Sequence, residues 1–363
     1  MIRFPIPSLQ RERASQGRRF PGLATSVLMW VSFCGAFTRA EVLPPPPIPV
    51  TLPLPAPNAF GVSVAFGPGD GLMYVWDGAS VLKQDAPLAT TYSSIGDVGS
   101  GSADAGPIAF SRDAGELLIG NGAGGLLGGS HAGLIFTIPS SGGDSHVEIA
   151  TIEFHDNFLA APLGISNHKF FVNQGNVSFS ASSVSVLDNT DGTNVPVIGN
   201  IPGPSGGMAI HSSGRLFVGV GFGPQRGQLR SFPLSAVEMA YDTDMPLDWD
   251  DGEVFNSLDN NSGFGMFFDA RGFLFAGGPN GVTVFDPEGN AVVYENNGFT
   301  GVVYDSLNDR VLVTGFGDHQ GLYPSSLFVV PEPATAALAL GFAVVLIPRW
   351  RRRLTSWQSH RIR

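Results

Sequence analysis

The sequence predicts an all-β fold, a single β-propeller of about six four-stranded blades, on three observations. An apolar phrase recurs along the 363 residues at a mean spacing of about 48, which is the size of one propeller blade. The chain contains 48 Gly and 28 Pro, and only 14% of its residues are charged, which excludes a coiled coil and a charge-rich disordered chain. The apolar runs are short, β-branched or aromatic, and bounded by Gly-containing turns, which is typical of strands and not of helical repeats.

Each copy of the repeat consists of an apolar triplet, a polar stretch with Gly or Asp, and a second apolar strand. The third residues of successive triplets lie 36 to 58 positions apart. One blade per copy accounts for these spacings and places the propeller at residues 59–330. The six triplets are Val64–Phe66, Ile108–Phe110, Leu163–Ile165, Met208–Ile210, Met266–Phe268 and Val302–Tyr304.

The fifth copy predicts a whole blade. Turn sequences rich in Gly, Asn and Asp separate its apolar runs, and such tight turns join antiparallel strands. Its predicted strands are Gly265–Phe268, Phe273–Ala276, Val282–Phe285 and Ala291–Tyr294.

The sixth copy is one strand short. It offers Val302–Tyr304, Arg310–Thr314 and Ser326–Val329. We expect Ile48–Leu54 to supply a fourth strand and close the ring. Pro49 and Pro53 restrict that segment to an edge position, because proline cannot donate a ladder hydrogen bond.

Two turn motifs make the body resemble the six-bladed propellers of the NHL and gluconolactonase-like superfamily. They are the D-x-x-G turn at Asp269–Gly272 and the F-D-P-x-G turn at Phe285–Gly289. Lactonase-like catalysis in that family implies carboxylate and Asn ligands that converge on an axial divalent cation. The residues directly before the six triplets are Ser63, Pro107, Pro162, Gly207, Gly265 and Gly301, none of them a carboxylate or an amide.

The sequence therefore selects no catalytic residue. Asn157, Asn173 and Asp156 could approach the axis, but no spacing singles them out. The His residues form no HxH or HExxH pattern, so a transition-metal site is not indicated. We expect those of the body in turns or at strand ends, solvated or capping: His131, His146, His155, His168, His211 and His319.

Residues 1–40 are predicted to be a secretory signal peptide. Arginines precede an apolar run, Leu23–Phe37, and the small residue Ala40 ends the segment. This order of basic, apolar and small residues is that of a signal cleaved after Ala40. Cys34, the one cysteine, would be lost with it. Residues 41–58 are rich in Pro and are predicted to be an extended linker.

The C-terminus resembles the bacterial PEP-CTERM sorting signal. Ala334–Ile347 is an apolar run of 14 residues, or about 21 Å as a helix, which is short for a membrane span. The motif residues are Pro331, Glu332, Pro333, Arg349, Arg351, Arg352 and Arg353.

This resemblance implies a sorting signal with a short transmembrane helix at 331–353 and a basic cytoplasmic tail at 354–363. It implies an exosortase as partner and the inner membrane as the location before processing. The final location would be the cell surface or the extracellular space, beside exopolysaccharide. An ordinary tail anchor is the alternative, although such an anchor needs a longer apolar span.

Two acidic segments are candidate Ca²⁺ sites. Hard oxygen ligands at this density suit Ca²⁺, but neither segment has EF-hand spacing, and solvated loops between blades are the alternative. The candidate ligands are Asp188 and Asp191 in the first segment, and Asp242, Asp244, Asp248 and Asp250 in the second.

The net charge of the body, residues 41–330, is opposite in sign to that of the two ends. Six Arg and one Glu fall in residues 1–40, and six Arg and one Glu in 331–363, which leaves residues 41–330 with a net charge of −21. An acidic body disfavours nucleic acid as a partner. The sequence favours an exported surface or matrix protein whose propeller binds a polysaccharide or surface protein without catalysis. The alternatives are a propeller hydrolase or lactonase with an axial divalent cation, and a matrix protein cross-linked by Ca²⁺.

Overall fold

The computed structural model divides the chain into two compact units, Met1–Arg39 and Ala40–Arg363. All residues that the structure describes belong to the second unit. They are residues 41–44, 46, 50–51, 54–55, 63–98, 106–121, 133–143, 146–152, 154–175, 180–204, 206–257, 265–295, 298–315 and 321–330. The predicted signal peptide and the sorting signal, with Ala40, Pro331, Glu332, Pro333, Arg349, Arg351, Arg352 and Arg353, lie outside them.

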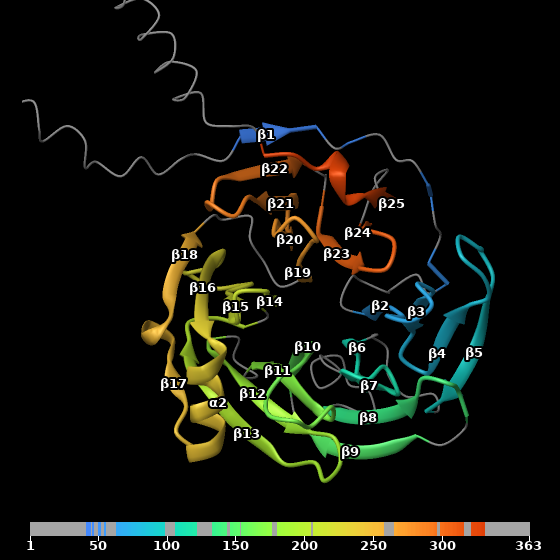
Figure 1. The fold of residues 1–363 in the computed structure, drawn as a ribbon, viewed down its shortest axis with the longest axis horizontal. Coiled ribbons are helices and arrows are strands. Elements are labelled where there is room, and N and C mark those ends of the chain that lie inside the picture. Colours follow the sequence, from blue (N-terminus) through green and yellow to red (C-terminus); the bar gives the residue numbers. More distant parts are fainter. Residues whose placement is uncertain are drawn as a thin grey trace, which may run out of the picture. The chain divides into compact units, whose positions relative to one another are not determined.

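The second unit is a six-bladed β-propeller, which confirms the predicted architecture (Figure 1). Six sheets surround one axis, and one edge strand of each sheet lies innermost. Successive inner strands contact one another around the ring, and the last inner strand contacts the first, so the ring is closed.

The first three blades follow one another along the chain. Blade one contains β2 (Val64–Phe66), β3 (Met73–Trp76), β4 (Ser80–Gln84) and β5 (Tyr92–Asp97). Blade two contains β6 (Ile108–Phe110), β7 (Glu116–Gly120), β8 (Leu134–Pro139) and β9 (Val147–Thr151). Blade three contains β10 (His155–Ala160), β11 (Lys169–Gly175), β12 (Ser182–Asp188), β13 (Asn194–Ile201) and the short β17 (Leu247–Asp248).

The last three blades complete the ring. Blade four contains β14 (Met208–His211), β15 (Arg215–Gly219), β16 (Gln228–Pro233) and β18 (Glu253–Ser257). Blade five contains β19 (Met266–Phe268), β20 (Leu274–Gly278), β21 (Gly281–Phe285), β22 (Ala291–Glu295) and β1 (Glu41–Leu43). Blade six contains β23 (Thr300–Asp305), β24 (Arg310–Gly315) and β25 (Gly321–Pro324).

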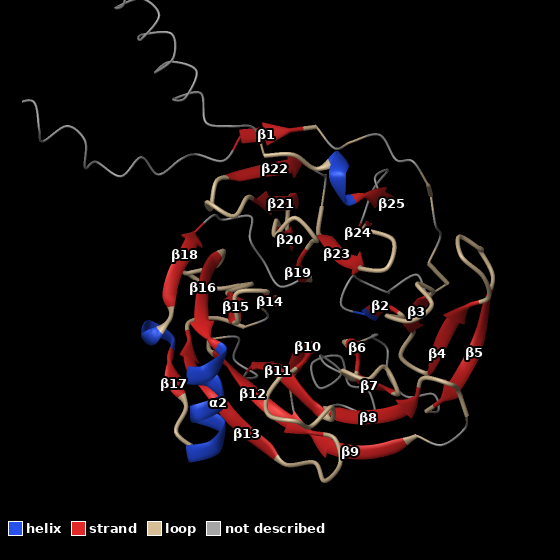
Figure 2. Ribbon diagram, in the orientation of Figure 1, coloured by secondary structure: helices blue, strands red, loops and turns tan. Residues whose placement is uncertain are grey.

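The described helices are short, and strands make up nearly all of the regular structure (Figure 2). Helix α2 (Leu234–Thr243), strand β17 and the 3₁₀ helix η2 (Trp249–Asp251) lie between the third and fourth strands of blade four. They form the acidic segment that the sequence suggests as a solvated loop between blades. A further 3₁₀ helix, η3 (Ser325–Leu327), follows β25. Within the described residues no helix is long and apolar enough to span a membrane.

Blade five shows how local sequence produces the hairpins. The predicted strands agree with the observed ones to within one or two residues. The turns need glycine at Gly272 (φ 81°) and Gly289 (φ 85°), because other residues rarely adopt these backbone angles. Asp269 accepts hydrogen bonds from the backbone N–H groups of Arg271 and Phe273, both at 2.9 Å, and so fixes the first turn.

Two strand predictions are wrong. The inner strand of blade three is His155–Ala160 and not Leu163–Ile165. The side chain of Ile165 is fully exposed, in a turn. In blade six the third strand is Gly321–Pro324, and the predicted strand Ser326–Val329 falls in η3 and the coil after it. Phe328 is nevertheless buried, because it packs against the aromatic rings of Phe275, Tyr294 and Tyr323.

The Pro-rich segment joins the propeller at two places. Strand β1 pairs in parallel with β22, so blade five gains a fifth strand. Val50 forms an antiparallel bridge with Leu322, whose N–H donates to the Val50 carbonyl at 2.9 Å. The expected closure of blade six from residues 48–54 thus appears as this single bridge, with Val50 and Leu54 packed against the apolar core nearby.

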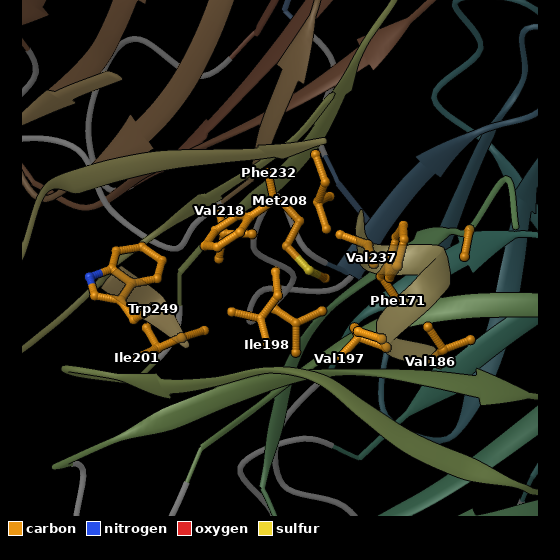
Figure 3. Packing of buried hydrophobic residues seen from close by; sticks show 14 of the residues in the cluster. Phe171, Val186, Val197, Ile198, Ile201, Met208, Val218, Phe232, Val237 and Trp249 are labelled. Atoms are coloured by element: carbon orange, nitrogen blue, oxygen red, sulfur yellow. The ribbon is translucent and has the colours of Figure 1, made fainter. Parts of the chain in front are cut away.

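Apolar side chains fill the spaces between neighbouring blades. The largest cluster joins blades three and four and includes Phe171, Met208, Phe232 and Trp249 (Figure 3). Burying one such side chain stabilises the fold by roughly 2 to 3 kcal/mol. Because each blade packs against the next, the ring holds its inner strands in fixed positions around the axis.

Candidate axial binding site

An axial channel with a volume of about 480 Å³ runs between the inner strands of the propeller. Residues of all six inner strands line it, and most are apolar, among them Ala65, Ala109, Leu159, Met266 and Val303. A cavity of this size with an apolar wall is typical of small-molecule sites.

Two stacked rings form part of the channel wall where blades five and six meet. Phe267 and Tyr304 lie 4.8 Å apart, with their planes at 2°. The Tyr304 hydroxyl donates to Asp309 at 2.8 Å and accepts from the Ala270 N–H at 3.0 Å. Burial raises the pKa of Tyr304 to about 12. The phenol therefore stays neutral and holds its ring in place.

Blade three contributes an asparagine to the channel wall. Asn157 on β10 lies directly opposite Asn173 on β11. Both amides donate to the carbonyl oxygen of Gly206, from Asn157 at 3.1 Å and from Asn173 at 2.7 Å. Asn157 also lines the channel. Blade three thus places an amide on a wall that is mostly apolar and whose other polar residues are Ser111, Arg112, Tyr304 and Ser306.

Two buried polar atoms in this region have no hydrogen-bond partner among the described residues. Asn173 is fully buried, and its Oδ1 has none. His155 is fully buried as well: its Nδ1 contacts the Ile152 carbonyl at 2.9 Å, and its Nε2 has no partner. The His155 ring stacks on Phe158, with centroids 5.2 Å apart. Burial lowers the pKa of His155 to about 4, so the ring is neutral at pH 7.

His155 corrects the expectation that the histidines are solvated or capping. It sits against Gly120 at the end of β7, where an added Cβ would lie 2.1 Å from Nε2. Sequence reasoning missed this residue because the triplet Leu163–Ile165 was assigned as the inner strand. The polar run His155-Asp156-Asn157 lacks the apolar pattern of the other five inner strands.

The described residues do not fit a divalent cation on the axis. No group of three or more His, Cys, Asp or Glu side chains among them could hold a metal ion. The channel wall described here carries the amide of Asn157 and no carboxylate. Two buried carboxylates elsewhere are already paired: Asp269 with Arg271 at 2.7 Å, and Asp305 with Arg310 at 2.6 Å. A doubly charged ion needs anionic ligands to offset its lost hydration.

The first acidic segment forms the turn between β12 and β13. Oδ1 of Asp188 accepts from the Thr190 N–H at 3.0 Å and from the Thr190 hydroxyl at 2.6 Å. Oδ1 of Asp191 accepts from the Thr193 N–H at 2.9 Å, which lowers the pKa of Asp191. These carboxylates stabilise the turn itself.

The second acidic segment is spread over several elements. Asp242 belongs to helix α2, and Asp244 ends that helix in the left-handed region (φ 52°). Asp248 caps η2 and accepts from the Asn200 amide at 2.6 Å. Asp250 pairs with Arg230 at 2.9 Å. Ca²⁺ binding by these six aspartates stays a prediction, which calorimetry with millimolar Ca²⁺ would test.

Comparisons with known proteins agree with this fold. No protein-family model matches the chain, and no curated protein matches it by sequence. A gluconolactonase from Xanthomonas campestris is 15% identical, with a TM-score of 0.51 over 74% of this chain and 96% of the other. A calcium-binding regucalcin from Agrobacterium tumefaciens is 15% identical, with a TM-score of 0.52 over 77% of this chain and 89% of the other.

A third solved structure, a putative gluconolactonase, is 13% identical, with a TM-score of 0.50 over 73% of this chain and 91% of the other. Identities this low establish the architecture and not the activity. The chain therefore shares the six-bladed propeller fold of the gluconolactonase-like proteins.

Proposed function

We propose that the propeller binds a small, largely apolar organic molecule in its axial channel, and that hydrolysis of a cyclic ester is the first activity to test. The observation that carries the proposal is the channel itself: about 480 Å³, lined by all six inner strands, mostly apolar, with Asn157 on the blade-three side and Arg112 in the β6–β7 turn of blade two. Pockets of roughly 300 to 1,000 Å³ with a few placed polar groups are the usual form of small-molecule sites.

The reaction class rests on the comparisons. Two of the similar structures named above are a gluconolactonase and a putative gluconolactonase. They favour the propeller hydrolase over the non-catalytic matrix module that the sequence alone favours. Because the described wall does not fit a divalent cation, we assign no step to such an ion.

Asn157 is the residue we expect to orient a ligand. Its amide already contacts the Gly206 carbonyl at 3.1 Å and lies on the channel wall, so a ligand carbonyl or hydroxyl there would meet a fixed partner. A positioned polar group on an apolar wall fixes ligand orientation more than it adds affinity.

The test uses the purified full chain with aliphatic γ- and δ-lactones. A pH-stat measures hydrolysis, and ligand-observed NMR measures binding. We expect saturable binding and lactone opening faster than in buffer. Val303→Trp narrows the channel and should reduce both by about tenfold or more, the effect of losing roughly 1.4 kcal/mol of binding. Val147→Trp is the matched control, because Val147 is 57% exposed on the outer strand of blade two.

The arms of this assay separate the candidates. Binding without hydrolysis would retain the channel as a site and favour a non-catalytic module. Because the described channel wall carries no carboxylate, we expect hydrolysis to persist in EDTA. A strict requirement for added Ca²⁺ would contradict this expectation. No binding of any lactone, with Val303→Trp equal to wild type, would overturn the proposal.

Export and sorting form a second proposal, which rests on the termini. We propose cleavage after Ala40 and recognition of Pro331-Glu332-Pro333 by an exosortase at the inner membrane. Both processing sites lie outside the described residues, so this proposal is supported by the residue patterns of the termini alone. Mass spectrometry of the exported chain should find Glu41 at the N-terminus. An intact Met1 in the cytoplasm would contradict export.

A further inference from the structure

A second cavity lies away from the axis, between blades four and five. Its volume is about 430 Å³. Residues of β14, β15, β16 and β18 form one side, and β19 with the two turns of blade five forms the other. All of its lining residues fall in the described ranges 206–257 and 265–295. We call it the blade four–five pocket.

Aromatic rings form the floor of the blade four–five pocket. Phe217 contacts Phe255 edge-on with centroids 5.1 Å apart, and contacts Phe268 at 4.9 Å. His211 lies against Phe268 at 4.7 Å. Phe217 is buried, whereas Phe255 and Phe268 are half-buried where the pocket opens. These two rings therefore present aromatic carbon to a ligand.

The rim of the pocket carries an excess of negative charge. Arg215 pairs with Glu253 at 2.8 Å, and this pair is neutral as a whole. Asp286 and Glu288 also line the pocket, and neither has an ion-pair partner among the described residues. The Asp286 carboxylate accepts from Asn290, at 2.8 Å from its backbone N–H and 2.7 Å from its amide. Two carboxylates are thus left without a counter-charge beside the aromatic floor.

We propose that the blade four–five pocket binds a small organic cation, of the quaternary ammonium or alkylammonium class. Aromatic faces attract such cations by their quadrupole, and the two unpaired carboxylates add a Coulomb attraction. An anionic ligand would meet these carboxylates, and a neutral one would gain nothing from them. The proposal does not depend on the function of the axial channel, because the two cavities share no lining residue.

The probe is tetramethylammonium chloride, titrated into the full chain at constant ionic strength and followed by saturation-transfer NMR. Its neutral counterpart of similar shape, tert-butanol, is the ligand control. We expect saturable binding of the cation in the millimolar range and at least about fivefold weaker binding of the alcohol, since only the cation gains the charge and quadrupole terms.

Variants of opposite sign test the electrostatic argument. Glu288→Gln removes an exposed carboxylate and should weaken binding about two- to fivefold. Arg215→Gln removes the one cation that lines the pocket and should tighten binding by a similar factor. Phe255→Leu keeps the apolar volume but removes the ring, and should weaken binding about threefold. Glu148→Gln, an exposed charge on blade two, is the matched control and should change nothing.

Each outcome bears on the proposal. Equal binding of tert-butanol, or no saturable binding of tetramethylammonium, would overturn it. So would a Glu288→Gln variant and an Arg215→Gln variant that both bind like wild type while their melting temperatures show that they are folded. Loss of lactone binding in Val303→Trp with unchanged tetramethylammonium binding would show that the two sites are independent.

Discussion

Blades three and five are built alike and differ at the axis. Each has four antiparallel strands and a fifth that pairs in parallel at the outer edge: β17 on β13 in blade three, and β1 on β22 in blade five. Their inner strands are different. Blade five presents Met266-Phe267-Phe268, whereas blade three presents His155 and Asn157.

This difference points to blade three as a source of polar groups for binding. A propeller is stable when apolar side chains fill the spaces between blades, and most of the buried side chains of blade five are apolar. Blade three places two amides and an imidazole in the same kind of space, which is costly unless they are hydrogen-bonded. Hydrogen bonds offset this cost only in part, because Asn173 Oδ1 and His155 Nε2 have no hydrogen-bond partner among the described residues. Such unpaired polar groups are uncommon in a protein core, and these two lie on the strands that carry Asn157 and its cross-strand partner.

We expect the largest loss of stability where the C-terminal residues pack against blade five. Phe328→Ala removes a ring that is 1% exposed and should lower the free energy of unfolding by about 4 kcal/mol. Urea unfolding measures this change. Leu327→Ala, at the neighbouring residue that is 42% exposed, should cost less than about 1 kcal/mol. Equal losses in the two variants would show that Phe328 does not fix this end of the chain.

We expect the next largest loss of stability beside the buried His155 of blade three. Gly120→Ala should lower the free energy of unfolding by about 3 kcal/mol, because the new Cβ would lie 2.1 Å from Nε2 of His155 and 2.8 Å from Phe158. Gly69→Ala is the control, since no atom lies within 4 Å of its added Cβ, and its stability should stay within about 0.5 kcal/mol. A Gly120→Ala variant as stable as this control would place His155 elsewhere.

Blade three should also make the propeller sensitive to acid. The pKa of His155 falls from 6.5 in the unfolded chain to about 4 in the folded one. The unfolded chain therefore binds the proton first, and stability present above pH 6.5 is lost as the pH falls toward 4. The His155 contribution is about 2 kcal/mol between pH 7 and pH 5.

Comparing urea unfolding of wild type with His155→Phe at both pH values isolates that contribution. The variant should lose about 2 kcal/mol less than wild type on going from pH 7 to pH 5. Parallel losses in the two proteins would mean that His155 is solvated in the folded state.

The smallest effect removes one contact of blade five. The Tyr294 hydroxyl donates to the Val329 carbonyl and accepts from the Val329 N–H, each at 2.8 Å. Tyr294→Phe should lower the free energy of unfolding by about 1 kcal/mol, the usual worth of such bonds. Amide exchange at Val329 should rise with it. Unchanged exchange would show that the two Tyr294 hydrogen bonds do not hold this backbone segment.

The same two blades show what the sequence could predict. Blade five follows from its sequence because apolar alternation and glycine turns coincide at every hairpin, so local preference and tertiary structure agree. Blade three does not, because its inner strand is polar and the apolar triplet Leu163–Ile165 next to it lies in a turn. A periodicity argument selects the apolar run and passes over the polar strand.

The candidate sites could be predicted only in part. Asn157 and Asn173 are visible as polar residues near the axis, but their meeting depends on strand register and on a carbonyl from the next blade, at Gly206. The floor of the blade four–five pocket joins Phe217, Phe255 and Phe268, which lie up to 51 positions apart. Contacts of this range come from the closure of the ring, which no local pattern encodes.

A crystal structure of the protein soaked with an aliphatic lactone would show directly whether the axial channel is the small-molecule site. We expect ligand density between the six inner strands, with the ligand's polar end within hydrogen-bonding distance of the Asn157 amide. Density confined to the outer surface, with the channel empty at a saturating lactone concentration, would contradict it.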